Sequence, residues 1–162
     1  LFFAARGLDV ERIGVVKAVY PTVWGALQIA TGMLSDRLGR KGLIAWGMVV
    51  QAGGIWLTVL VPDYQAWLAG AILQGVGTAL VYPTLLAAIT DHAHPTWRAS
   101  SLGVYRFWRD LGYAVGALLS GLIADTVGIE AAIHVVATLT LLSGGVVGVA
   151  MHRPAPASVV AH

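Results

Sequence analysis

Long apolar stretches separated by short polar segments dominate the chain. Five of them are long enough to cross a hydrocarbon core of about 30 Å as α-helices, at approximately residues 13–34, 42–61, 66–89, 101–124 and 129–151. None of the five alternates apolar and polar residues, as the strands of a membrane β-barrel would. The pattern therefore predicts an all-α membrane protein, a polytopic helical bundle whose consecutive helices run antiparallel.

The two ends of the chain differ from these spans. Residues 1–5 are apolar and precede Arg6, whereas a signal peptide would place its basic region first. We interpret residues 1–5 as the end of a truncated transmembrane helix, and the chain as a fragment of a longer protein. Residues 152–162 are rich in Pro and Ala, and we expect them to form a cytoplasmic tail.

The positions of the basic residues predict an orientation, because cytoplasmic loops are enriched in Lys and Arg. One side of the predicted bundle carries Arg37, Arg40, Lys41, Arg98 and Arg153, and the other carries Arg6 and Arg12, with Lys17 able to extend its ammonium group to that second side. The loops near residues 35–41 and 90–99, together with the tail, are therefore predicted to be cytoplasmic.

Composition supports a membrane protein and excludes several classes of function. Hydrophobic residues make up 57% of the chain and charged residues 11%, and the mean hydropathy is +0.77, far above that of soluble domains. The net charge of +2 comes from scattered residues, so no nucleic-acid surface is predicted. Cysteine is absent, His92 and His94 have no third ligand nearby, and no hydrolase or nucleotide-binding motif occurs. We therefore predict no metal, no cofactor and no enzymatic activity.

The sequence contains an internal repeat. Shifting it by 89 positions without gaps aligns residues 14–39 with residues 103–128. The matched pairs include Lys17 and Arg106, Asp36 and Asp125, and Gly39 and Gly128. An odd number of predicted crossings separates the two copies, so they would have opposite orientations in the membrane. Inverted repeats of this kind are typical of secondary transporters.

The stretch "GMLSDRLGRK" resembles the cytoplasmic signature of the major facilitator superfamily, G-x-L-x-D-R-x-G-R-[KR]. Its defined positions are filled by Gly32, Leu34, Asp36, Arg37, Gly39, Arg40 and Lys41. Residues 74–91 and 97–125 are also similar to the tenth and eleventh helices of bacterial members. The resemblance covers nearly the whole chain and implies half of the superfamily's fold, with inverted three-helix repeats.

The resemblance also implies which half is present and what it does. The last span is followed by a short tail instead of a long central loop, which favours the carboxy-terminal half, with the amino-terminal half as an alternative. The implied function is secondary active transport of a small solute, coupled to protons, in a bacterial-type inner membrane. The expected partners are the lipid bilayer, the solute, protons and the missing other half of the chain. A non-transporting membrane sensor or scaffold, or an intramembrane enzyme, are the competing interpretations.

The signature residues are expected to act in gating. Asp36 at a helix end can accept hydrogen bonds from another helix, and Gly32 can let a neighbouring helix come close. By resemblance, Asp36, Arg37 and Arg40 hold the outward-facing state. The alternative is that the basic residues only fix topology, which is the role we expect for Lys41.

Three charged residues, Arg106, Arg109 and Asp110, lie well inside the fourth predicted span. Ionisable residues in such positions face a partner or a cavity by default. Arg106 and Asp110 are spaced i,i+4, so we expect an internal ion pair between them, with Arg109 reaching back to the cytoplasmic surface. A direct part in ion coupling is the alternative.

One polar stripe marks the third predicted span. Gln74, Thr78 and Tyr82 follow i, i+4, i+8 spacing on an otherwise apolar helix. By resemblance this helix lines the central cavity, so these residues are candidate substrate contacts. Gln28, with Trp24, is a weaker candidate on the first predicted span.

Overall fold

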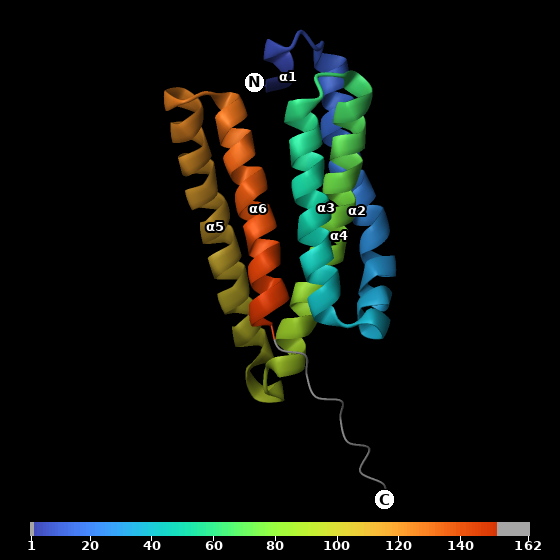
Figure 1. Cartoon of the computed structure of the whole chain (residues 1–162). Coiled ribbons are helices and arrows are strands. Elements are labelled where there is room, and N and C mark those ends of the chain that lie inside the picture. The colour runs from blue at the N-terminus through green and yellow to red at the C-terminus, as the bar shows by residue number, and fades with distance from the viewer. Residues whose placement is uncertain (1, 152–162) are drawn as a thin grey trace, which may run out of the picture.

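A computed structural model describes residues 2–151, which form six α-helices and a short 3₁₀ turn (Figure 1). The α-helices are α1 (Phe2–Ala5), α2 (Val10–Leu38), α3 (Arg40–Leu60), α4 (Tyr64–His92), α5 (Arg98–Thr126) and α6 (Ile129–Ala150), and the 3₁₀ turn η1 (Pro95–Trp97) precedes α5. The five long helices match the predicted spans, with α2, α4 and α5 two to four residues longer at each end and α3 and α6 ending one residue earlier than predicted. Leu1, Arg153 and the predicted tail at 152–162 lie outside the described residues.

Aspartates start two of the long helices. The Asp9 carboxylate accepts a hydrogen bond from the backbone N–H of Arg12 at 2.8 Å, at the beginning of α2. The Asp63 carboxylate accepts from the backbone N–H groups of Gln65 and Ala66, at 2.9 and 3.3 Å, at the beginning of α4. These side chains satisfy amide groups that have no partner within the first helical turn.

The helix turns follow the predicted repeat. α2 gives way to α3 at Gly39, with φ of 86°, and α5 gives way to α6 at Gly128, with φ of 122°. Only glycine adopts such angles without strain, so the same residue type is required at both turns. α2 and α5 run in opposite directions along the bundle (Figure 1). The helix pairs α2–α3 and α5–α6 therefore agree with the inverted repeat offset by 89 residues.

Glycines bring α3 and α4 into backbone contact. A Cβ atom added at Gly54 would lie 2.7 Å from the carbonyl oxygen of Gly70, and one added at Gly77 would lie 2.6 Å from that of Gly47. Small residues are what permit such close packing between membrane helices.

The remaining helices are arranged around this pair. α2 packs along α4, and α6 packs along α3. α5 lies beside α6, separated from α2 and α3 (Figure 1). None of its described residues is buried, and its exposed side chains include Phe107, Trp108, Leu118 and Leu122.

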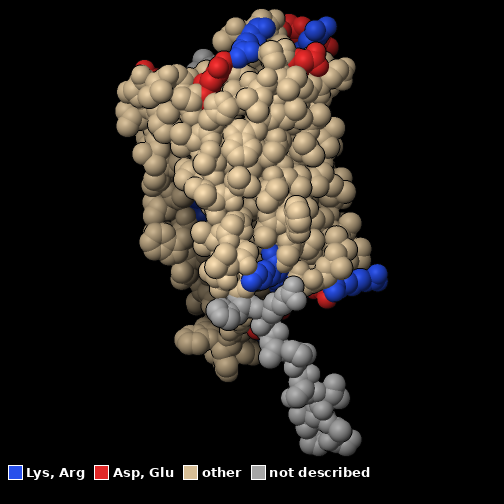
Figure 2. Space-filling view, in the orientation of Figure 1, with Lys and Arg blue, Asp and Glu red and all other residues tan. Residues whose placement is uncertain are grey.

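Charge distribution fits a membrane-spanning bundle. In the face shown in Figure 2, most charged side chains lie at the two ends of the molecule, and the broad belt between them shows only a small patch of Lys or Arg atoms. Of the described helices, α2, α3, α4 and α6 are long and apolar enough to cross a membrane. α5 has the length but carries Arg106, Arg109 and Asp110 along its middle. The span predicted at residues 101–124 thus stays a prediction, as does the membrane helix that would end at α1.

The contact between α3 and α4 predicts that alanine substitutions at two adjacent glycines, Gly53 and Gly54, have very different effects on stability. In the full-length protein, Gly54→Ala should lower stability by about 1–3 kcal/mol, because its Cβ meets backbone atoms that cannot move aside. The control is Gly53→Ala, whose Cβ would meet nothing within 4 Å among the described residues. Thermal unfolding in detergent, followed by tryptophan fluorescence, measures both. Equal melting temperatures for the two variants would contradict the packing described.

Candidate functional site

The signature turn, residues 32–41, places Arg40 at the centre of an ionic cluster. Arg40 Nη1 donates to Asp36 Oδ1 at 2.7 Å and also to the Ser35 hydroxyl. Its Nε donates to Asp91 Oδ2 at 3.0 Å. The Arg40 side chain is only 18% exposed, although both carboxylates face solvent more openly. The Arg40 cluster therefore joins the end of α2, the start of α3 and the end of α4.

The other signature residues make fewer contacts. Arg37 and Lys41 form no ion pair or side-chain hydrogen bond with residues 2–151. A Cβ at Gly32 would meet no described atom within 4 Å, so the close helix contact expected there stays a prediction. Gly39 supplies the positive φ of the turn, which lets Arg40 begin α3 directly after α2 ends.

Sequence reasoning missed two members of the Arg40 cluster. Ser35 fills a variable position of the signature, and Asp91 lies in a different span, more than fifty residues along the chain. A usable signal for Asp91 was its place at the end of a predicted span, on the same side of the bundle as the signature turn. Carboxylates at that level are natural partners for a partly buried guanidinium.

The ion pair on α5 differs from the one expected. Asp110 pairs with its neighbour Arg109, whose Nε and Nη2 lie 2.9 and 2.8 Å from Asp110 Oδ1. Arg109 Nη1 donates to the Tyr82 hydroxyl on α4 at 2.9 Å. Arg106 forms no ion pair or side-chain hydrogen bond within the described part of the chain. The i,i+4 pair between Arg106 and Asp110 is therefore not formed, because Arg109 reaches the carboxylate and a partner on α4 at once.

The polar stripe on α4 faces three different helices. Gln74 Nε2 lies 3.5 Å from the Thr58 hydroxyl of α3, a long hydrogen bond. The Thr78 hydroxyl lies 3.3 Å from that of Tyr20 on α2. Tyr82, the third stripe residue, accepts from Arg109 on α5, as described above. The predicted stripe thus joins α4 to each of its neighbours. The Gln28 side chain is exposed and hydrogen-bonds to none of the described residues.

Aromatic rings connect α2 to the Arg109 contact. The Trp24 ring meets the Tyr82 ring nearly perpendicularly, with centroids 5.8 Å apart. The Arg109 guanidinium carbon lies 5.5 Å from the centroid of the same Tyr82 ring, within the range of a cation–π interaction. Trp24 Nε1 is buried and has no hydrogen-bond partner among the described residues. We refer to Trp24, Tyr82, Arg109 and Asp110 as the aromatic–guanidinium cluster.

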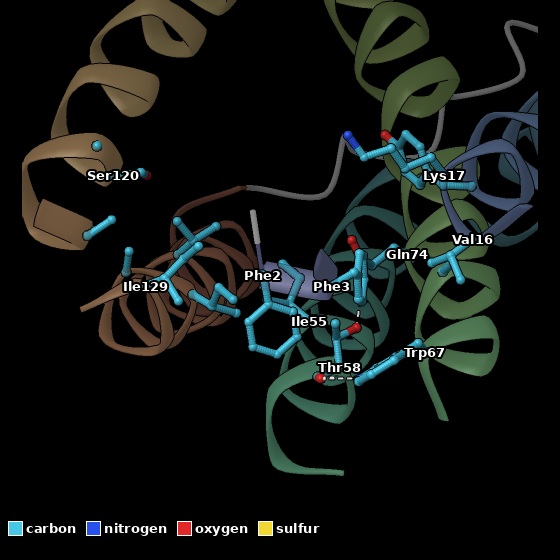
Figure 3. Close-up of a pocket in the computed structure, with 17 residues that line it drawn as sticks. Phe2, Phe3, Val16, Lys17, Ile55, Thr58, Trp67, Gln74, Ser120 and Ile129 are labelled. Carbon is cyan, nitrogen blue, oxygen red and sulfur yellow. Dashed lines mark hydrogen bonds between the residues drawn. The ribbon is translucent and has the colours of Figure 1, made fainter. Parts of the chain in front are cut away.

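A cavity of about 600 Å³ lies between α5 and α6 on one side and α2, α3 and α4 on the other (Figure 3). Its polar lining comes from Lys17, Tyr20, Thr58, Gln74 and Ser120. Lys17 is its one charged lining residue within the described chain. Figure 3 shows the Lys17 ammonium end directed into the space between the helices. The sequence-based expectation differs, since it has Lys17 extending to the side of the bundle that carries Arg6 and Arg12. Gln74 alone of the predicted substrate contacts lines this cavity.

Sequence comparison decides the family of the chain. The family model described as the Major Facilitator Superfamily matches residues 2–161, almost the entire sequence. The chain belongs to this superfamily. Its members are membrane transporters and not enzymes. The resemblance carried by the signature turn is thereby confirmed, as is the all-helical fold.

Individual members of the superfamily are similar to the chain over most of its length. The inner membrane transport protein YajR of Escherichia coli is 30% identical over 84% of the chain. The probable anion transporter 4, chloroplastic, of Arabidopsis thaliana is 30% identical over 77% of it, and the multidrug resistance protein MdtH of Klebsiella pneumoniae is 28% identical over 73%. The chain spans 30%, 24% and 29% of the lengths of these three relatives.

The Arg40 cluster predicts that Arg40 stabilises the signature turn more than Arg37 does. Arg40→Lys in the full-length protein should speed hydrogen exchange at the α2–α3 turn and also at the end of α4, because a lysine cannot bridge three acceptors with a planar group. We expect a local destabilisation of about 1 kcal/mol, since the carboxylates are partly solvated. Arg37→Lys is the matched control. Unchanged exchange at the end of α4 in Arg40→Lys would exclude the Asp91 contact.

Proposed function

We propose that the full-length protein is an ion-driven secondary transporter of a small solute, with protons as the coupling ion. Family membership supports transport, and the ion pair in the middle of α5 carries the ion-driven part of the proposal. Asp110 is the thirteenth of the 29 residues of α5, which puts it about 18 Å along a helix about 43 Å long. Ionisable groups at such depth are costly and usually functional.

The geometry suggests how Asp110 would take part. Its carboxylate depends on Arg109 for a counter-charge, and Arg109 is bound in turn to Tyr82 on another helix. A movement of α5 relative to α4 would break the Arg109–Tyr82 bond and leave the guanidinium free to turn away from Asp110, whose carboxylate could then take up a proton. Reformation of the pair would release the proton, as alternating access requires. Arg106 has no part in this scheme because it contacts neither group.

We assign gating to the signature turn. The Arg40 cluster supports this role because it holds the ends of three helices together, where a change of conformation would have to separate them. Gln74, Thr78 and Tyr82 are proposed solute contacts on α4, and Gln28 stays a weaker candidate. The side of the bundle with the signature turn carries more Lys and Arg than the opposite side, which favours an orientation with that turn in the cytoplasm.

We further propose that the chain is the carboxy-terminal half of its transporter, in a bacterial-type inner membrane. The similarity to tenth and eleventh helices of bacterial members supports the first statement, and the inner-membrane location named for YajR supports the second. The relatives' names include an anion transporter and a multidrug resistance protein, so family membership alone selects no solute.

Proteoliposomes containing the full-length protein test the proposed function. An imposed proton gradient should drive accumulation of at least one member of a panel of radiolabelled solutes, and a protonophore should abolish it. Transport that needed ATP after all ion gradients had collapsed would refute the proposal. Saturable binding of a solute without translocation would identify a membrane sensor instead.

Asp110→Asn tests the coupling role. The variant should lose gradient-driven accumulation by at least about tenfold while retaining solute exchange, because exchange needs no net proton movement. Asp125→Asn, at the exposed end of the same helix, is the matched control and should accumulate solute normally. Full accumulation by Asp110→Asn would remove this carboxylate from the coupling mechanism.

Asp36→Asn tests the gating role. The substitution keeps the size of the side chain but removes the charge that pairs with Arg40, so the signature side should open more readily. Transport should fall severalfold in a protein that remains folded, and a cysteine introduced at the exposed Leu38 should react faster with a water-soluble maleimide. If transport and labelling both equal those of the parent, the signature acts only on topology.

A further inference from the structure

The aromatic–guanidinium cluster combines the chemical groups that recognise an organic cation. Aromatic ring faces attract ammonium and guanidinium groups, and a nearby carboxylate adds a counter-charge. Here the Tyr82 ring and the Asp110 carboxylate already hold a cation, the guanidinium of Arg109, at 5.5 Å from the ring centroid and 2.8 Å from the carboxylate. The protein therefore occupies the site with one of its own side chains.

Two features show that the cluster has capacity beyond this internal cation. Arg109 contacts only Oδ1 of Asp110, whose Oδ2 has no partner within residues 2–151, and the Asp110 side chain is 62% exposed. The Trp24 ring packs against the Tyr82 ring, so the carboxylate stands beside an aromatic pair. The free carboxylate oxygen and the aromatic pair both offer partners to a bound cation.

Within the described residues, few contacts hold Arg109 in this place. α5 has no buried residue in the described structure, and its contact with α4 is small beside the glycine contact of α3 with α4. The Arg109 side chain is 27% exposed, so a rotamer change can carry the guanidinium away without opening the core. Displacement of Arg109 therefore requires no rearrangement of α2, α3 or α4.

We propose that organic cations bind on Tyr82 beside Trp24 and Asp110, in competition with Arg109. An organic anion is the less suitable ligand, because Nε, Nη1 and Nη2 of Arg109 all point at Asp110 or Tyr82. The proposal rests on the proposed transport function and names its solute class. It also links solute binding to Asp110, since an arriving cation would replace Arg109 as the partner of that carboxylate.

Competition with an internal cation has a distinctive consequence. Removing Arg109 should tighten binding of the external cation, because the site no longer spends most of its time occupied. Loss of a typical cation–π contact and its hydrogen bond corresponds to a gain of about tenfold in affinity. A purely structural arginine would give the opposite result, since its loss would disorder the site.

Equilibrium dialysis with the detergent-purified full-length protein tests the proposal, with radiolabelled tetraphenylphosphonium as probe. Arg109→Gln should bind it about tenfold more tightly than the parent. Arg106 lies one turn from Arg109 on α5 and has no described ion pair or side-chain hydrogen bond. Arg106→Gln removes the same charge as Arg109→Gln, and it should change the affinity less than about twofold. Equal tightening in both variants would mean a general electrostatic effect and would overturn the proposal, as would the absence of saturable binding in Arg109→Gln.

Two further measurements examine whether the probe binds on the Tyr82 ring and whether the site selects cations. Tyr82→Phe keeps the ring but removes the acceptor of Arg109, so it should bind the probe at least as tightly as the parent, whereas Tyr82→Leu in the Arg109→Gln background should weaken binding about tenfold. Radiolabelled tetraphenylborate, an anion of the same shape, should show no saturable binding in a separate dialysis without the cation, and saturable binding of it to Arg109→Gln would refute cation selectivity. Because binding is measured without a gradient, a protein that binds the cation but never translocates it would refute transport and leave this site intact.

Discussion

Helices inside a hydrocarbon core gain nothing from covering apolar surface with one another, so their association depends on close backbone contact and on polar bonds. Between α3 and α4 that requirement is met at two levels, where Gly47 faces Gly77 and Gly54 faces Gly70. α2 approaches α4 in the same way at Gly75, where an added Cβ would lie 2.8 Å from a carbonyl oxygen of α2. The direction of every polar side chain on α4 follows from these contacts, because a helix packed against two neighbours has no freedom to rotate.

α5 associates with α4 through polar bonds instead of close backbone contact. It has no such backbone contact with α4 and is joined to it mainly through the Arg109–Tyr82 bond and the stacking of the same two groups. Arg109, one of the charged residues that make α5 less apolar than the other long helices, is thus also the residue that attaches it to α4. Its exposed apolar side chains remain available to lipid or to other parts of the full-length protein.

The helices and turns were readable from the sequence because each depends on local signals. The lengths of the apolar stretches predicted the spans, and the 89-residue repeat predicted that Gly39 and Gly128 occupy equivalent turns. Tertiary partners were not readable in the same way. The i,i+4 rule favoured Arg106 as the partner of Asp110, but it contains no information on Tyr82, whose hydroxyl reaches Arg109 only because of how α4 is rotated.

α4 supplies a partner to both arginine clusters, Tyr82 for Arg109 and Asp91 for Arg40. The two residues are nine positions apart, which on an α-helix is about 14 Å of rise and two and a half turns, so they face opposite directions. A displacement of α4 toward one arginine would therefore stretch its bond to the other. Since glycine contacts and the Arg40 cluster hold α4 to α3, a break of the Arg109–Tyr82 bond displaces the Arg109 side chain or α5 and leaves α4 in place. In the proposed transport function, Asp110 would therefore act through α5 and its side chains against an α2–α3–α4 unit that stays together.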